Sequence, residues 1–282
     1  MLTNGKNQLN YLDMLSKSRL EKLLKLKTRK GRKEEKRFLV EGKRFLKEAL
    51  ESNWEMELVL FSEIFKRTPE EESLLNEIKN KGIDIIPVKN QIMKSLSDTV
   101  TPQGIIGVMK KKEFISQEAF ALKKTLAKDT DFVLALDSVQ DPGNLGTLLR
   151  TADAAGVDSV LLSEDTAEFY NPKVLRSTMG SIFHLPIFKD VNLKNTIPLL
   201  KRRGFKIFAS EVKEGKLYDQ LDYSGKVCLI IGSEATGIDK KIIELSDEMV
   251  RIPIYGKAES LNASVAGGII LFEMARKRRL NK

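Results

Sequence analysis

Cysteine, histidine and long hydrophobic runs are scarce in this sequence. Only one of its 282 residues is cysteine and one is histidine, so an internal disulfide framework is impossible and a metal site built on these residues is not expected. Cys228 lies in the apolar run 227–231, which indicates a small core residue. The chain contains no apolar stretch of 18 residues, and none near its N-terminus is suited to a secretion signal. We therefore expect a cytoplasmic protein without a membrane partner.

The usual catalytic constellations are also missing. His184 is the only histidine, and its apolar neighbours indicate a core residue more than a general base. Neither a Ser-His-Asp triad nor an HExxH motif is evident. We therefore expect chemistry that depends on positioning an already activated group donor, without a metal.

Positive charge is concentrated at the N-terminus. Residues 1–50 hold 15 Lys and Arg against 6 Asp and Glu, whereas the remaining chain holds 33 of each sign, so the whole net charge of +9 lies in this segment. Such a local field favours a polyanion such as RNA, although a solvated basic tail without a ligand is the alternative. The candidate RNA-binding residues are Arg29, Lys30, Arg32, Lys33, Lys36, Arg37 and Arg44.

Hydrophobic patterning predicts two α/β domains. Residues 12–28 suggest a helix with a basic face, and 28–37, without apolar residues, suggest an exposed loop or flexible arm. We assign 1–34 to a basic extension, 35–110 to a small β/α domain, 111–130 to a linker and 131–282 to a larger domain. In the small domain we expect strands at 38–40, 56–61, 83–88 and 104–109, and helices at 43–50 and 69–79.

The larger domain alternates strands with helices, which predicts a parallel sheet covered on both faces. Strands are expected at 132–138, 157–163, 184–188, 205–210, 226–232 and 248–254. Helices are expected at 146–155, 172–179, 192–203, 238–246 and 262–278. Ligands bind in the loops that follow the carboxyl ends of such strands.

The first unusual loop, 139–146, contains Gly143, Asn144 and Gly146. It could present backbone N–H groups and a helix N-terminus to an anion, or it could be a tight turn in which Asn144 tolerates left-handed geometry. Arg150 follows on a mostly apolar helix, so we expect it to pair specifically or to reach solvent.

Two further loops are unusual. In the loop 232–238, Gly232 and Gly237 could allow a ligand to approach the backbone, and Glu234 adds a carboxylate that could instead cap the next helix. In the loop 252–264, Pro253 suggests departure from the sheet. Ser260, Asn262 and Ser264 crowd one helix start there, where a single N-cap is needed. Gly267 and Gly268 in that helix suggest close packing.

Together the three loops resemble the motifs of the SpoU (TrmH-like) family of RNA 2′-O-ribose methyltransferases, in the SPOUT superfamily. They read LDSVQDPGNLGTLLRTADAAG at 136–156, IIGSEATGI at 230–238, and IPIYG followed by ESLNAS within 252–264. Residues 170–181 are similar to the family segment between the first two motifs, and the likeness spans roughly 131–278. Upstream, 38–44 and 101–105 resemble the family's L30e-type substrate-binding domain. The Ile254-Tyr255 pair, where a Met is frequent, is a departure that should not alter the chemistry.

The resemblance implies a C-terminal trefoil-knotted α/β domain, a smaller N-terminal L30e-like domain, and a homodimer with the active site near the subunit interface. It implies S-adenosylmethionine as the cofactor. The catalytic set carried over is Asn144, Arg150, Glu234, Ser260 and Asn262. The cofactor-binding set is Gly232, Glu234, Gly237, Ile252, Pro253, Ser260, Leu261 and Asn262.

In the implied reaction a sulfonium methyl group moves to a ribose 2′-hydroxyl, and alignment can supply much of the rate. We expect Arg150 to hold an RNA phosphate or the developing oxyanion. Because a guanidinium stays protonated, a phosphate or water held by Arg150 is the better proton acceptor. Asn144 and Ser260 would orient the ribose, and Glu234 would fix Arg150 or Asn262.

Other functions fit less well. A non-catalytic RNA-binding factor in ribosome assembly would need lost cofactor loops, and a Rossmann oxidoreductase would need a GxGxxG motif that the chain lacks. The motifs favour ribose oxygen over a base nitrogen as the target. We expect a structured RNA substrate, with large-subunit (23S-type) ribosomal RNA favoured over tRNA.

Overall fold

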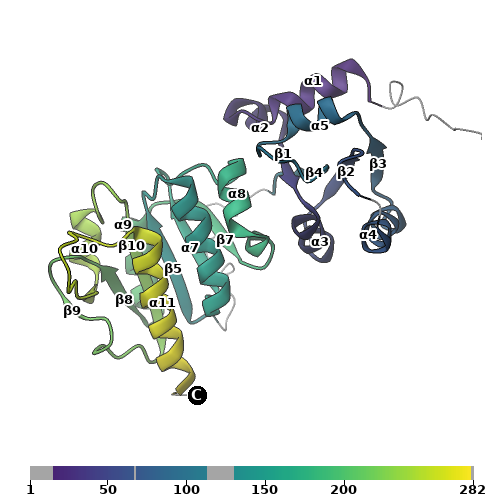
Figure 1. Ribbon diagram of the computed structural model, residues 1–282. Helices are drawn as coiled ribbons and strands as arrows, with labels where there is room; N and C mark the ends of the chain where they lie inside the picture. Colours follow the sequence, from purple (N-terminus) through teal and green to yellow (C-terminus); the bar gives the residue numbers. More distant parts are fainter. Residues whose placement is uncertain (1–14, 67, 113–129, 281–282) are drawn as a thin grey trace, which may run out of the picture. The chain divides into compact units, whose positions relative to one another are not determined.

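The computed structural model describes residues 15–66, 68–112 and 130–280, and the chain divides into two compact units, 1–112 and 113–282 (Figure 1). The predicted linker at 111–130 lies almost entirely outside the described residues. Among the helices of the described ranges, none combines the length and hydropathy that a membrane span requires.

The N-terminal unit contains a mixed four-stranded sheet in the order β1-β4-β2-β3. Strands β1 and β2 pair antiparallel with β4, whereas β2 and β3 are parallel. The strands are β1 (Arg37–Glu41), β2 (Met56–Phe61), β3 (Asp84–Pro87) and β4 (Ile105–Lys110), which confirms the predicted strands to within one residue. The helices are α1 (Lys17–Lys25), α2 (Arg29–Glu35), α3 (Lys43–Glu51), α4 (Pro69–Asn80) and α5 (Asn90–Leu96).

The basic segment differs from its prediction, because α2 occupies most of the stretch expected to be a loop or flexible arm. Thr28 caps this helix by accepting a hydrogen bond from the Gly31 backbone N–H over 3.0 Å. A Cβ at Gly31 would lie 2.0 Å from the carbonyl oxygen of Lys25, so glycine lets the two short helices approach closely. Arg32 is only 3% exposed, and its Nη1 donates to the Leu26 carbonyl over 2.8 Å. Local capping and one buried arginine therefore order a segment that has no apolar residue.

Helix α1 belongs to the core of the N-terminal unit and does not form a separate extension. Leu23 and Leu26 are buried in one apolar cluster with Leu58, Leu60 and residues of α5 and β4. The boundary that we expected at residue 35 therefore does not separate two bodies in the described part of the chain.

The C-terminal unit contains a seven-stranded sheet in the order β7-β6-β5-β10-β8-β11-β9, in which every described strand pair is parallel. The strands are β5 (Phe132–Asp137), β6 (Ser159–Ser163), β7 (Ile187–Val191), β8 (Phe205–Ser210), β9 (Lys216–Leu217), β10 (Lys226–Gly232) and β11 (Glu248–Arg251). The helices are α7 (Pro142–Ala155), α8 (Pro172–Thr178), α9 (Leu193–Arg202), α10 (Lys240–Leu245) and α11 (Ala263–Leu280), with a 3₁₀ turn at Ser181–Phe183. The predicted parallel α/β sheet is confirmed.

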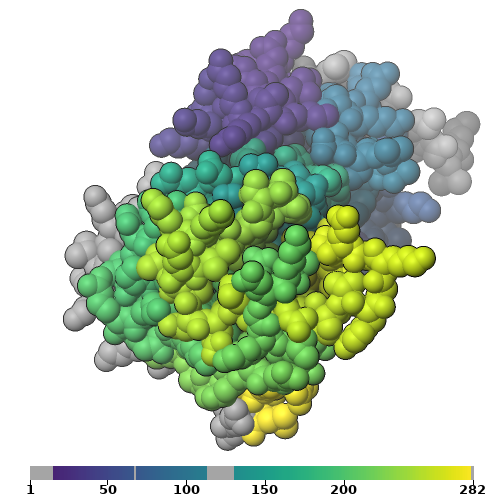
Figure 2. Space-filling model, turned by 90° about the vertical axis from the view of Figure 1, so that its left-hand side faces the viewer, coloured from purple at the N-terminus to yellow at the C-terminus, as the bar shows by residue number. Residues whose placement is uncertain are grey.

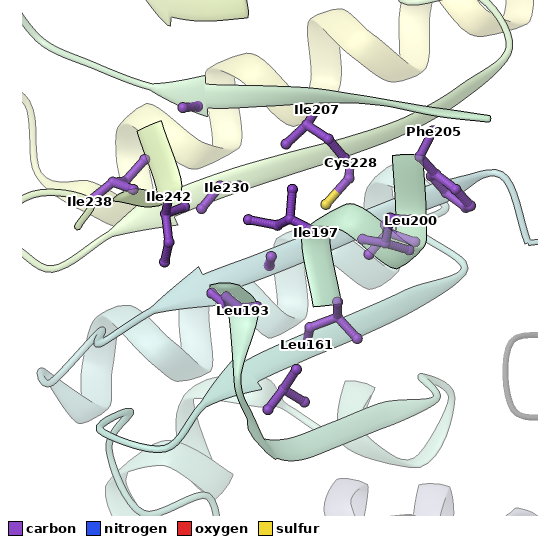
Figure 3. Close-up of a cluster of buried hydrophobic side chains, with 14 of the residues drawn as sticks. Leu161, Leu193, Ile197, Leu200, Phe205, Ile207, Cys228, Ile230, Ile238 and Ile242 are labelled. Atoms are coloured by element: carbon purple, nitrogen blue, oxygen red, sulfur yellow. The ribbon is translucent and has the colours of Figure 1, made fainter. Parts of the chain in front are cut away.

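Alternating residues of β10 face the two helical layers. Cys228 and Ile230 pack with Ile197 of α9 and Ile242 of α10 (Figure 3). Ile231 points the other way, because a Cβ built on Gly267 of α11 would lie 3.5 Å from its Cγ1 atom. Cys228 is fully buried, which confirms the predicted core role, and burial raises the pKa of its thiol to about 12.

Several local predictions are corrected. Strand β7 starts at Ile187, three residues after the predicted start. His184 lies before it and is exposed, where we expected a core position, and its Nδ1 atom is 2.9 Å from Asp153 Oδ2. Helix α7 begins at Pro142, so the predicted loop around Asn144 is the first turn of a helix.

Candidate functional site

Asn144 is the centre of a hydrogen-bonded chain that joins the three unusual loops. Its Nδ2 donates to Glu234 Oε1 over 2.6 Å, and its Oδ1 accepts from Asn262 Nδ2 over 2.9 Å. The side chain is 8% exposed, so both bonds are partly shielded from water. Helix α7, the loop after β10 and the segment before α11 are thereby held together by one amide.

The first turn of α7 orients this amide, and the turn hypothesis for Asn144 is wrong. Asp141 is the N-cap, and its Oδ1 accepts the backbone N–H of Asn144 over 2.8 Å. This bond, followed by the ion pair with Lys173, keeps the pKa of Asp141 below its usual value. Asp141 was not among the predicted site residues, although Asp before Pro at a helix start is a recognisable N-cap pattern.

Asn262 caps the helix that follows the third loop. Its Oδ1 accepts from the backbone N–H of Ser264 over 2.9 Å and from Ser264 Oγ over 2.6 Å. The Nδ2 group remains for Asn144. Two of the three crowded polar residues are therefore explained by one cap, whereas Ser260 is exposed and makes no hydrogen bond within the described ranges.

The second loop closes on itself around its two glycines. Ser233 and Gly237 exchange backbone hydrogen bonds of 3.1 and 2.9 Å, and Gly237 has a φ of +69°. A Cβ at Gly232 would lie 2.4 Å from the carbonyl carbon of Gly237, so the close approach is made by the chain itself. Asp239, not Glu234, caps α10, which leaves Glu234 for Asn144.

The end of β5 is tied to the same loop by a second residue that the sequence analysis missed. Asp137, which is 7% exposed, accepts the backbone N–H of Asp239 on its Oδ2 atom over 2.9 Å. It is the last residue of β5 and pairs in register with Gly232, the last residue of β10. The sequence feature that could have identified Asp137 is a carboxylate at the end of a buried strand.

The third loop offers many unused backbone groups. Residues 252–261 make no hydrogen bonds with other parts of the chain that the structure describes. Ile252, Pro253 and Ile254 are half-buried, whereas the following residues are exposed, including Leu261 at 36% and Tyr255 at 94%. Figure 2, viewed from the side of α10 and β9, shows this yellow segment and the yellow-green α10 segment at the surface. Unpaired backbone N–H and C=O groups beside apolar side chains suit a ligand with both polar and apolar parts.

Arg150 is not part of the Asn144 chain. It lies on the exposed face of α7, and its side chain makes no hydrogen bond or ion pair with another described residue. The expected contact between Glu234 and Arg150 is therefore absent, and the expected contact between Glu234 and Asn262 runs through Asn144. Of the five predicted catalytic residues, the structure brings together three and leaves Arg150 and Ser260 exposed.

The candidate RNA-binding residues fall into an exposed group and a group that is buried or paired within the protein. Arg29, Lys30, Lys33, Lys36 and Arg44 are exposed. Arg32 is buried and bound to the protein backbone, so its guanidinium is not available to RNA while α1 and α2 are folded. Arg37 is half-buried and paired with Glu57. In the described ranges, no group of three or more His, Cys, Asp or Glu residues is placed to bind a metal ion.

Two family models match the chain. The model of the SpoU rRNA Methylase family matches residues 131–272, and the model of an MRM3-like substrate binding domain matches residues 17–107. The second match includes α1 and α2, in agreement with their packing in the N-terminal unit.

Known proteins are similar over nearly the whole length. A Bacillus subtilis protein named 23S rRNA (guanosine(2553)-2′-O)-methyltransferase RlmP is 35% identical over 250 residues, which cover 89% of this chain and 93% of that protein. An AdoMet-bound rRNA methyltransferase structure from Sinorhizobium meliloti has a TM-score of 0.78 at 28% identity and covers 91% of this chain and 94% of that one. The SpoU methyltransferase AviRb from Streptomyces viridochromogenes, at 24% identity, shares the fold with a TM-score of 0.81 over 94% of this chain and 99% of its own.

Proposed function

This chain belongs to the SpoU rRNA methylase family, and from that premise we propose that it transfers a methyl group from S-adenosylmethionine to a ribose 2′-hydroxyl of 23S-type ribosomal RNA. The observation that carries the proposal is the Asn144 chain, in which one buried amide joins Glu234 and Asn262. All three motifs that the family shares thus meet in one hydrogen-bonded unit. The RlmP relative, named for 2′-O-methylation of 23S rRNA, supports the choice of RNA.

The residues around the third loop fit the cofactor. S-adenosylmethionine combines an adenosine, a charged amino acid and a sulfonium, so its site needs both polar and apolar contacts. Ile252, Pro253 and Leu261 supply apolar surface beside backbone groups that have no partner in the described chain. We assign Gly232, Gly237, Ser260 and the side chains of Glu234 and Asn262 to the same site.

When bound, S-adenosylmethionine supplies an activated methyl group, and the chain positions the acceptor. An amide has two N–H donors and two acceptor lone pairs. After its bonds to Glu234 and Asn262, Asn144 retains one of each for the ribose hydroxyl. The guanidinium of Arg150, which has no partner among the described residues, holds an RNA phosphate or the developing oxyanion. Ser260, exposed in the third loop, helps to orient the ribose.

The proposal extends to assembly and architecture. Val265 and Phe272 are spaced by two turns on one face of α11 and are 51% and 53% exposed, which supports a homodimer that covers this face. We also propose the trefoil knot and the L30e-like domain that the family resemblance implies; the strand order, with β8 between β10 and β11, is compatible with a threaded chain. The proposed ribosomal RNA substrate supports a cytoplasmic location.

The test is mass-spectrometric mapping of ribose methylation in rRNA and tRNA from cells with and without the gene. We expect one 2′-O-methyl signal in 23S-type rRNA to disappear and to be restored by the wild-type gene but not by Arg150→Ala. Arg202→Ala, which removes an exposed arginine of α9 outside the site, is the matched control and should restore the signal.

Arg150→Lys separates the two roles of the arginine, because lysine keeps the charge but loses the planar fork. Full methylation by this variant would contradict a bidentate role. A lost signal in tRNA would move the substrate to tRNA. If no ribose methyl group changes and the purified protein fails to bind S-adenosylmethionine, a non-catalytic RNA-binding role replaces the proposal.

A further inference from the structure

The N-terminal unit contains a pocket of about 310 Å³, near the lower end of ligand pockets, which span about 300–1,000 Å³. The floor is apolar and is made by Leu23 of α1, Leu26 directly after it, Leu58 of β2 and Val108 of β4. Its charged lining residues are Arg19, Lys22, Glu35, Arg37 and Glu57. A concave apolar floor with charged walls suits a small ligand that has a flat apolar body and polar edges.

Arg37 forms a fixed, planar wall of this pocket. Its Nε and Nη2 atoms donate to the two carboxylate oxygens of Glu57, and its Nη1 donates to the Glu35 carbonyl over 2.8 Å. These bonds lie in the plane of the guanidinium and raise its pKa, chiefly through the bond to Glu57. The side chain is still 41% exposed. Since the edges of the group are occupied, its flat face is the part offered to a ligand, and flat guanidinium faces stack on nucleobases.

The remaining charged groups of the pocket have the chemistry to bind the rest of a nucleotide. Arg19 and Lys22 are exposed, lie one turn apart on α1 and line the same pocket, which suits a phosphate. The carboxylate of Glu35 is half-buried and makes no hydrogen bond with another described residue, so it can accept N–H groups from a base edge.

We infer that this pocket receives one unpaired nucleotide of the RNA substrate, an inference that rests on the proposed RNA-directed function. The base stacks on the face of Arg37 above the apolar floor, and its N–H edge donates to Glu35. Arg19 and Lys22 hold the adjacent phosphate. The N-terminal unit therefore recognises an unstacked base as well as the charge of the RNA backbone.

Photo-crosslinking tests this placement directly and does not depend on methylation. The probes are transcripts of 23S-type rRNA and of tRNA that contain 4-thiouridine, irradiated with the full-length protein and mapped by mass spectrometry. We expect cross-links on peptides that contain residues 19–26, 35–37 or 57–58. Cross-links confined to other peptides of the N-terminal unit, or no RNA binding at all, would overturn the inference. Cross-links in the pocket without any methylation would sustain it while rejecting the proposed reaction.

The variant Glu35→Gln separates base recognition from charge attraction, because the two predict opposite signs. Removing a negative charge should strengthen binding that depends on charge alone. If Glu35 accepts base N–H groups, the variant should instead weaken binding of the cross-linked transcript, by roughly fivefold or more, because glutamine turns one acceptor oxygen into an N–H donor and makes only a neutral bond with the other. Unchanged or tighter binding overturns the role of Glu35 and the inference with it.

A charge-matched pair of variants tests the phosphate contact. Arg19→Ala/Lys22→Ala removes two charges that line the pocket, and Lys79→Ala/Lys94→Ala removes two exposed charges of α4 and α5 that do not. The pocket variant should weaken RNA binding by about tenfold more than the control at the same salt concentration. Circular dichroism of both proteins establishes that they are folded, and equal losses of affinity would contradict a specific phosphate contact.

Discussion

The side chain of Asn144 bridges Glu234 and Asn262, with its amide nitrogen 2.6 Å from the carboxylate and its amide oxygen 2.9 Å from the second amide. The partners lie 90 and 118 residues away along the chain. Because Asn144 is anchored by the Asp141 cap at the start of α7, it transmits the position of that helix to both later loops. The site is thus a product of three loops that cannot be oriented independently.

We predict that Asn144→Ala lowers kcat by at least about 100-fold, because it removes both bonds and the groups left for the ribose hydroxyl. The free energy of unfolding should fall by only about 1–3 kcal/mol, since two partly buried bonds are lost. Single-turnover methylation of the RNA substrate and urea unfolding measure the two effects.

Glu234→Gln is the matched control for Asn144→Ala. Glutamine keeps an oxygen that can accept from Asn144, so kcat should fall less than in the alanine variant. If Asn144→Ala retains the wild-type kcat, or if Glu234→Gln is the more damaging change, the bridge does not position the reacting groups.

The parallel sheet and the three loops were predictable from sequence because their signals are local. Residues 227–231 form a continuous apolar run and 205–210 is apolar apart from Lys206 and Ser210, and parallel strands place their following loops at one edge. The contacts inside the site were not predictable in the same way. Glu234 could have reached Arg150, Asn262 or a helix N-terminus, and only the relative placement of α7 and the loop after β10 selects Asn144.

The helical basic segment was missed for a different physical reason. Apolar periodicity is the main signal for a helix, and residues 29–35 have none. Their order depends on the Thr28 cap, on the contact of Gly31 with the Lys25 backbone and on the buried Arg32. An arginine that satisfies a backbone carbonyl inside the fold has the same sequence appearance as one that binds RNA.

We predict that Arg32→Ala and Lys33→Ala, at adjacent positions, have different consequences. Loss of the buried Arg32 leaves the Leu26 carbonyl without that donor and removes packing, so the free energy of unfolding should fall by about 2–3 kcal/mol. Lys33 is exposed, and its loss should change stability by less than about 0.5 kcal/mol while reducing the salt dependence of RNA binding by about one unit of slope.

Trp54, the only tryptophan, lies in the N-terminal unit and provides the fluorescence signal for urea unfolding. It packs edge-on against Phe38 of β1, so its emission should change when this unit unfolds. Equal stability of the two variants would show that the buried contact of Arg32 contributes nothing measurable.

We predict that alanine substitutions at two glycines change the free energy of unfolding in opposite directions. A Cβ at Gly146 would lie 2.4 Å from Ser177 Cβ and 2.5 Å from the Val174 carbonyl, so Gly146→Ala must separate α7 from α8 and should cost about 1–3 kcal/mol. At Gly268 of α11, the nearest atom is 3.6 Å away, and Gly268→Ala should stabilise the helix by about 0.5–1 kcal/mol. Thermal unfolding followed by circular dichroism compares the two, and a stabilising Gly146→Ala would contradict the packing.

The buried thiol of Cys228 predicts a pH dependence of stability with a definite sign. Burial raises its pKa from 9.0 to about 12, so the folded chain holds the thiol proton at pH values where the unfolded chain releases it. The contribution of the buried thiol to the free energy of unfolding is therefore complete below pH 9. It is lost as the pH rises towards about 12, at about 1.4 kcal/mol per pH unit. Between pH 8.5 and 10.5 the loss should amount to about 2 kcal/mol.

Cys228→Ala isolates this contribution, because every lysine and tyrosine that titrates in the same range is present in both proteins. The alanine variant should be less stable at pH 8 by about 1–2 kcal/mol, since a small cavity replaces the sulfur, but its stability should fall less steeply with pH. Urea unfolding of both proteins by circular dichroism at pH 8.5, 9.5 and 10.5 gives the two slopes. Identical slopes would mean that the thiol is ionised as easily in the folded chain as in the unfolded one. That result would contradict its burial on β10 against α9.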